Sequence, residues 1–133
     1  ILPSICVDAA CDGSPGRLEY RGVDTESRRQ IFQAGPYADG TNNVGEFLAI
    51  VHALAFLEQE GLSLPVYSDS ETAIAWVRLG RCNTDLASDA RNTALFDLLD
   101  RAEEWLQQHP DRPTVLKWDT GAWGENPADF NRK

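Results

Sequence analysis

Polar and apolar residues alternate along the first quarter of the chain in the way that is typical of β-strands. The run Ile5-Cys6-Val7 and the segments 18–23 and 28–34 have this character, and turn-forming residues separate them at 12–16 and 24–27. The pattern predicts three strands in a meander.

Helical spacing replaces the alternation further along the chain. Apolar positions from Phe47 to Leu57 predict a first helix that ends at Gly61. A second helix is expected after the segment 68–71, and a third over 95–106, where polar residues separate apolar ones three or four positions apart.

Two short apolar runs, Leu64–Tyr67 and Thr114–Trp118, complete the pattern as strands. The order βββαβααβ predicts an α/β fold in which helices cover a five-stranded mixed sheet. With 133 residues, the chain is expected to form a single domain over 1–133.

Composition places the chain among folded proteins, with 42% hydrophobic and 25% charged residues. Neither a membrane-spanning run nor a signal peptide is recognisable, so we expect a cytoplasmic protein without a membrane partner. The sequence contains no Met, so Ile1 is not expected to be a translated start, and an upstream domain that aids substrate binding is a further expectation.

The formal net charge of −9 argues against a generic nucleic-acid-binding surface, because such surfaces neutralise phosphate with lysine and arginine. Binding to nucleic acid would then be modest and sensitive to salt, and would depend on local basic patches. Adaptation to high salt is an alternative origin of the acidity.

The three cysteines, Cys6, Cys11 and Cys82, show no metal-ligand spacing and are predicted to be free thiols. His52 and His109 lie outside any catalytic pattern and are interpreted as structural or solvent-facing.

Four acidic residues, Asp8, Glu46, Asp69 and Asp129, lie where predicted strands, helices or loops would converge. Two unit charges ~5 Å apart at an effective dielectric of ~20 repel by roughly 3 kcal/mol, so a group of four favours a bound cation. Carboxylate ligands without thiolate or imidazole favour Mg²⁺, with Mn²⁺ as the alternative.

Each acid also has a simpler interpretation. Asp69 and Glu46 could serve a helix N-terminus, with Glu46 in the first turn of its helix, and Asp129 could be a surface acid. Asp8 fits such a role least, because an ionised aspartate inside an apolar strand is costly unless it is paired or metal-bound.

The segments VDAACDGSPG, TNNVGEFLAIVHAL, YSDSETAIAWV and ENPADF resemble, in this order, the four motifs of type 1 ribonuclease H. The resemblance implies a ribonuclease H-like fold and a Mg²⁺-dependent endonuclease that cuts the RNA strand of RNA–DNA hybrids, acting as a monomer. It also implies that Asp8, Glu46, Asp69 and Asp129 are catalytic and bind two Mg²⁺ ions.

The same resemblance implies the substrate contacts. They are expected from the first-strand turn, the start of the first helix, the residue two after Asp69, and the last strand: Cys11, Asp12, Gly13, Ser14, Thr41, Asn42, Asn43, Glu71 and Trp118. Asn42 or Asn43 could instead simply cap the helix.

Many relatives carry a histidine in the loop before the last acid, and this chain has none there. Asp119 or Glu125 is the hypothesised replacement, and Trp123 is expected to report motion of this loop. Two alternatives stay open: a non-catalytic module of the same fold that binds nucleic acid or protein, and a related metal nuclease with another substrate.

Overall fold

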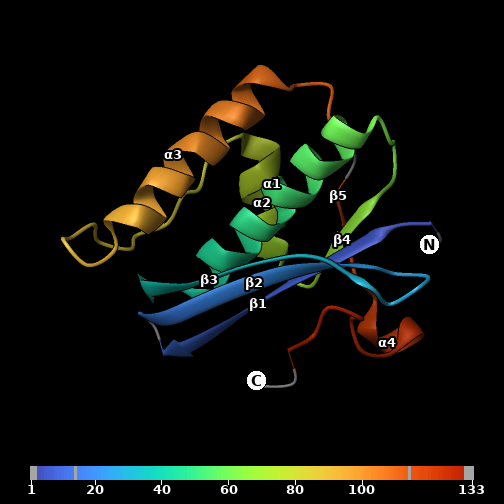
Figure 1. Cartoon of the computed structure of the whole chain (residues 1–133), viewed down its shortest axis with the longest axis horizontal. Coiled ribbons are helices and arrows are strands. Elements are labelled where there is room, and N and C mark those ends of the chain that lie inside the picture. Colours follow the sequence, from blue (N-terminus) through green and yellow to red (C-terminus); the bar gives the residue numbers. More distant parts are fainter. Residues whose placement is uncertain (1–2, 14, 114, 131–133) are drawn as a thin grey trace.

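The computed structural model describes residues 3–13, 15–113 and 115–130. Strands and helices follow one another in the order β1 (Ile5–Gly13), β2 (Gly16–Asp24), β3 (Gln30–Gly40), α1 (Asn42–Glu60), β4 (Val66–Ser68), α2 (Glu71–Leu79), α3 (Thr93–Gln108), β5 (Val115–Lys117) and α4 (Thr120–Trp123). Helices α1, α2 and α3 lie on one face of the sheet, and α4 lies on the other side (Figure 1).

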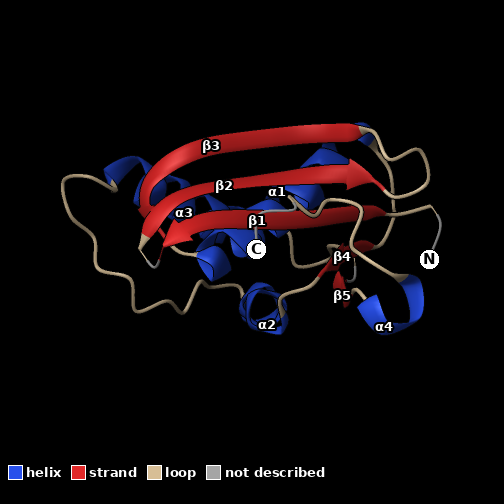
Figure 2. Ribbon diagram, turned by 90° about the horizontal axis from the view of Figure 1, so that it is seen from below, coloured by secondary structure: helices blue, strands red, loops and turns tan. Residues whose placement is uncertain are grey.

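The five strands form one sheet in the order β3-β2-β1-β4-β5. The long strands β1, β2 and β3 are antiparallel neighbours, whereas β1–β4 and β4–β5 are parallel pairs, as Figure 2 shows from the strand side. The predicted α/β fold with a five-stranded mixed sheet is therefore confirmed.

Helix α1 crosses the centre of the sheet and buries most of its residues against it. Gly45 makes this close approach possible, because a Cβ atom there would lie 2.4 Å from Cδ1 of Leu18. The hydroxyl oxygen of Thr41 accepts a hydrogen bond from the Val44 amide and caps the helix, so the alternative interpretation of Asn42 or Asn43 as the cap was wrong. Gly61 ends the helix in the left-handed conformation, at φ 67°.

Some boundaries differ from those expected. Strand β4 begins at Val66 rather than at Leu64, and Pro65, which has no amide hydrogen, contributes only its carbonyl, to the Ile5 amide at 3.0 Å. The short helix α4 was not predicted, because four residues are too few to show a periodic pattern. Its start is capped by Asp119, whose carboxylate accepts a hydrogen bond from the Ala122 amide at 3.1 Å.

The cysteine prediction is confirmed, and both histidine rings pack against aromatic side chains. Cys6, Cys11 and Cys82 are free thiols. The ring of His52 stacks on Phe32 at a centroid distance of 4.0 Å, and that of His109 stacks on Trp105 at 4.1 Å.

Across the described residues, none of the helices is both long and apolar enough to pass through a bilayer.

Candidate active site

Glu46 is buried between α1 and the sheet, with 1% of its surface exposed. Its Oε1 accepts a hydrogen bond from the Ala9 amide at 2.9 Å, and its Oε2 accepts one from the Ser68 hydroxyl at 3.0 Å. Because α1 begins at Asn42, Glu46 lies in the second helical turn, so its expected place in the first turn was wrong. Its orientation comes from two strands and not from the helix dipole.

Asp69 follows directly after the last residue of β4, at the carboxyl end of the strand. Its Oδ2 accepts a hydrogen bond from Nδ2 of Asn126 at 3.2 Å, and its Oδ1 lies 3.5 Å from the Thr120 hydroxyl. The cap of α2 is the hydroxyl of Ser70, which accepts from the Ala73 amide. The helix-capping interpretation of Asp69 was therefore wrong, and its carboxylate faces the segment around α4.

Asp8 lies in the middle of β1 and has no measurable exposure. The parallel register pairs Ile5 with Val66 and Cys6 with Tyr67, so two further steps along both strands bring Asp8 level with Asp69. On the other side of β1, the antiparallel register places Asp8 opposite Arg21 of β2.

Arg21 connects this part of the sheet to the segment that carries Asp129. Its guanidinium donates to the carbonyls of Ala128 and Asp129, each over 2.7 Å, and lies 4.9 Å from the ring centre of Phe130. The Asp129 amide donates in turn to the Asn126 carbonyl at 2.9 Å. The backbone of the segment that carries Asp129 is therefore held against the sheet by the side chain of Arg21.

Asn126 joins three of the four acidic segments. Its side chain donates to the Val7 carbonyl, next to Asp8, over 3.0 Å, and to Asp69. Its Oδ1 accepts from the Ala128 amide at 2.8 Å, and the whole residue is only 3% exposed. The segments of Asp8, Asp69 and Asp129 thus meet around one buried amide, and Glu46 joins them through Ala9.

A polar pocket of about 480 Å³ opens beside these residues. Glu46 and Asp69 both line it, together with the starts of α1 and α2 and the end of β5: Asn42, Asn43, Ser70, Glu71, Thr72 and Lys117. Two of the four predicted catalytic acids therefore share one open cavity, next to the strand that carries a third.

Within residues 3–13, 15–113 and 115–130, no three aspartate, glutamate, histidine or cysteine side chains form a group that would hold a metal ion by themselves. Proteins usually bind Mg²⁺ through one or two carboxylates, with water and substrate phosphates completing the coordination. The carboxylate donors at the pocket fit a hard cation held in that manner, and not one in a closed protein cage.

The expected substrate contacts fall into separate groups around the pocket. Asn42, Asn43 and Glu71 line it directly, and Oδ1 of Asn43 accepts from the Ser70 hydroxyl at 3.1 Å. Cys11, Asp12 and Gly13 lie at the far end of β1, where the Cys11 thiol donates to the Gly13 carbonyl. Ser14 lies outside the described residues.

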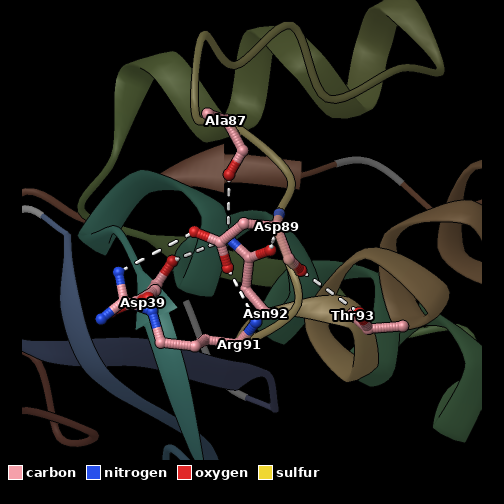
Figure 3. Close-up of polar contacts among 6 residues, drawn as sticks. All are labelled: Asp39, Ala87, Asp89, Arg91, Asn92 and Thr93. Carbon is pink, nitrogen blue, oxygen red and sulfur yellow. Dashed lines mark hydrogen bonds and ion pairs between the residues drawn. The ribbon is translucent and has the colours of Figure 1, made fainter.

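Thr41 lines a neighbouring cavity with the loop between α2 and α3. That loop is fastened to the end of β3 by a polar cluster, in which Nδ2 of Asn92 bridges the carbonyls of Asp39 and Ala87, and Arg91 pairs with Asp39 at 2.8 Å (Figure 3). The expected substrate contact at Thr41 thus lies beside three acids of the same cavity, Asp39, Asp85 and Asp89.

Trp118 is placed differently from the substrate-facing position that the resemblance implies. It is 2% exposed, its indole donates to the Gly124 carbonyl at 2.8 Å, and its ring contacts those of Tyr67 and Trp123. The indole is enclosed because it connects β5 to the turn after α4. Trp123 is the exposed aromatic of this group, at 43%.

The two loop acids have different surroundings. Asp119 caps α4, whereas Glu125 is exposed. Two other side chains of this loop, those of Thr120 and Asn126, reach the predicted catalytic acid Asp69.

Sequence reasoning missed the residues that orient the acids: Arg21, Ser68, Thr120 and Asn126. Only Asn126 gave a usable signal, because an Asn-Pro pair just before a motif acid indicates a turn.

A family model described as RNase H matches residues 4–117 and ends before Asn126 and Asp129. A ribonuclease H of Dinoroseobacter shibae is 31% identical over 126 residues, covering 80% of this chain and 79% of the relative. A ribonuclease H of Syntrophomonas wolfei is 36% identical over 76 residues, which is 57% of this chain and only 52%, about half, of that relative's length.

Among solved structures, LC11-RNase H1 in complex with RNA/DNA hybrid has the same fold, with a TM-score of 0.56 at 18% identity over 89% of this chain and 86% of that one. The family match covers most of the sequence, and the topology agrees with it. The chain belongs to the ribonuclease H family.

Proposed function

We propose that the chain is a divalent-cation-dependent endoribonuclease that hydrolyses the RNA strand of RNA–DNA hybrids. The observation that carries the proposal is the hydrogen-bonded convergence of the four acidic segments on Asn126 and Glu46. Family membership supports the same activity.

The acids would hold the cation from different elements. Glu46 and Asp69 would bind it from the wall of the polar pocket, and Asp8 and Asp129 would contribute from the adjoining strand and the C-terminal segment. Two bound Mg²⁺ ions, when present, supply a water of lowered pKa and stabilise the developing negative charge on phosphate and leaving oxygen.

Neighbouring residues of the chain orient the carboxylates of these acids. Ser68 and the Ala9 amide fix both oxygens of Glu46, so that its carboxylate has one direction before substrate arrives. Asn126 and Thr120 do the same for Asp69. Such preorganisation lowers the barrier because the charges need no rearrangement during the reaction.

Recognition of the hybrid would depend on 2′-hydroxyl groups in its wide minor groove, which distinguish RNA from DNA. The polar side chains of Asn42, Asn43 and Glu71 around the pocket suit such contacts. The RNA/DNA duplex bound by LC11-RNase H1 makes this hybrid the first substrate to test.

A non-catalytic binding module of the same fold is the second candidate. It is favoured by one observation: both oxygens of Glu46 are already engaged in hydrogen bonds within the protein. The two candidates differ in turnover and not in hybrid binding.

A cleavage panel separates these possibilities. End-labelled RNA–DNA hybrid, single-stranded RNA, double-stranded RNA and double-stranded DNA would be incubated with Mg²⁺, with Mn²⁺ and with EDTA. We expect cleavage of the RNA strand of the hybrid alone, and only with a divalent cation. Hybrid binding without cleavage would instead support the non-catalytic module, and preferential cutting of DNA duplexes would support another nuclease class.

A further inference from the structure

Lys117 is a positively charged residue on the wall of the pocket that contains Glu46 and Asp69. Among the described residues, the wall has one further charged side chain, Glu71, so that three carboxylates and one ammonium line it there. The sequence contains two lysines, Lys117 and Lys133, and the second lies outside the described residues.

The backbone fixes where Lys117 stands. It ends β5, and the parallel register pairs it with Ser68, the residue that immediately precedes Asp69. The Trp118 amide donates to the Ser68 carbonyl at 2.9 Å, so the pairing continues one step beyond Lys117. Neighbouring strands lie about 4.8 Å apart, which keeps the lysine backbone close to the start of the Asp69 segment.

The ammonium group of Lys117 is available to a ligand. In the part of the chain that the structure describes, the ion pairs within 4.0 Å are those of Arg91 with Asp39 and Asp89. The hydrogen bond recorded for Nζ of Lys117 goes to the Trp118 carbonyl and is long, at 3.4 Å. A flexible, solvated lysine of this kind is a point charge suited to phosphate.

We infer that Lys117 binds a backbone phosphate of the nucleic-acid substrate next to the phosphate that is cut. The inference rests on the proposed function, since it assigns a substrate contact within the same site. In a chain with a net charge of −9, an anionic duplex approaching three carboxylates needs a local positive charge, and Lys117 supplies it. The residue acts in binding and positioning, and it takes no proton in the reaction.

The test compares Lys117→Gln and Lys117→Arg with the wild type. Arg101→Gln is the matched control, because it removes one exposed positive charge from a different cavity, between α1 and α3. Hybrid binding would be measured by fluorescence anisotropy in EDTA over a range of KCl concentrations, and kcat and KM would be measured with Mg²⁺. Circular dichroism would establish that each variant is folded.

Loss of one phosphate contact should make the slope of log Kobs against log salt concentration shallower by about 1. We expect this for Lys117→Gln, together with a rise in KM of about fivefold and little change in kcat, since two charges ~4 Å apart in water interact by roughly 1 kcal/mol. Lys117→Arg should restore the wild-type slope, and Arg101→Gln should keep it.

A wild-type slope and KM in Lys117→Gln would overturn the inference while leaving the proposed function intact, provided that the wild type cleaves the hybrid. A wild type that binds the hybrid through Lys117 but never cleaves it would overturn the proposed function alone. A wild type that neither binds nor cleaves would overturn both.

Discussion

Asn126 donates a hydrogen bond from Nδ2 to Oδ2 of Asp69 over 3.2 Å, across 57 positions of sequence. The same amide group reaches the Val7 carbonyl at 3.0 Å, so one buried side chain sets Asp69 relative to the strand that carries Asp8. The two acids are therefore positioned by a residue that is itself uncharged.

Replacement of Asn126 by alanine should lower kcat by roughly 10- to 100-fold, because small displacements of reacting groups are costly. KM should change little, since the side chain is buried and does not face the pocket. Steady-state kinetics on an RNA–DNA hybrid measure both constants, and Asn83→Ala, at an exposed position, is the control. A folded Asn126→Ala variant with wild-type kcat would show that the amide does not position Asp69.

Ser68→Ala should destabilise the fold by about 1–3 kcal/mol, because it removes a buried hydrogen bond to the carboxylate of Glu46. The same change also removes the acceptor of the Ser70 amide, which lies 3.1 Å from the Ser68 hydroxyl. Urea unfolding measures the difference in free energy of unfolding between the variant and the wild type. Ser63→Ala, at an exposed loop position, should stay within about 0.5 kcal/mol of the wild type. Equal stabilities of the two variants would argue against the Ser68–Glu46 hydrogen bond.

Arg21→Gln should loosen the segment around Asp129, because the guanidinium makes two 2.7 Å hydrogen bonds to its carbonyls. Hydrogen exchange at the amides of Ala128 and Asp129 should accelerate while that of α1 stays unchanged. Arg17→Gln, an exposed position on the same strand, is the control. If exchange in that segment were the same in both variants, Arg21 would not anchor it.

His52 should make the free energy of unfolding depend on pH below the ordinary pKa of a histidine. Burial lowers the pKa of His52 from 6.5, so the unfolded chain binds its proton at a higher pH than the folded chain does. The contribution of neutral His52 to the free energy of unfolding is complete above pH 6.5. It is lost as the pH falls from there towards the lowered pKa of the folded state.

Thermal melts of the wild type and of His52→Phe across this range would check the effect. The phenylalanine keeps the stacking position against Phe32 but cannot titrate, and it gives up the hydrogen bond to the Tyr20 hydroxyl. The variant's melting temperature should therefore fall less than that of the wild type as the pH is lowered from 6.5. If the melting temperatures of the two proteins fell equally with pH, the lowered pKa of His52 would be contradicted.

The sheet and the main helices could be predicted because burial leaves a periodic trace in the sequence. Phe47, Ile50 and Leu54 are all buried on α1, as their spacing indicates. The four acids were predicted by a combination of costly burial, in the case of Asp8, and motif order. Burial of Asp8 is confirmed, whereas the catalytic roles of the four remain predictions.

What the sequence did not predict depends on single long-range contacts. Trp118 looks like any strand-end aromatic, and only the packing of Tyr67 and Trp123 around it explains its burial. The orientation of Glu46 comes from Ala9 and Ser68, at 37 and 22 positions along the chain, and no local pattern encodes such pairs. Helix α4 is set by one cap, at Asp119, and lacks the length for periodicity.

Single-turnover cleavage of a labelled RNA–DNA hybrid in Mg²⁺ by Asp8→Asn, Glu46→Gln, Asp69→Asn and Asp129→Asn tests the central claim most directly. Each amide variant should fold and bind the hybrid, yet lose roughly 100- to 1,000-fold in rate or more, as expected for loss of a preorganised charge. The double variant Asp8→Asn/Asp69→Asn should be no slower than the slower single variant, because residues that act as a unit are not additive. Rates within a few-fold of the wild type in these variants would contradict a shared metal-dependent site.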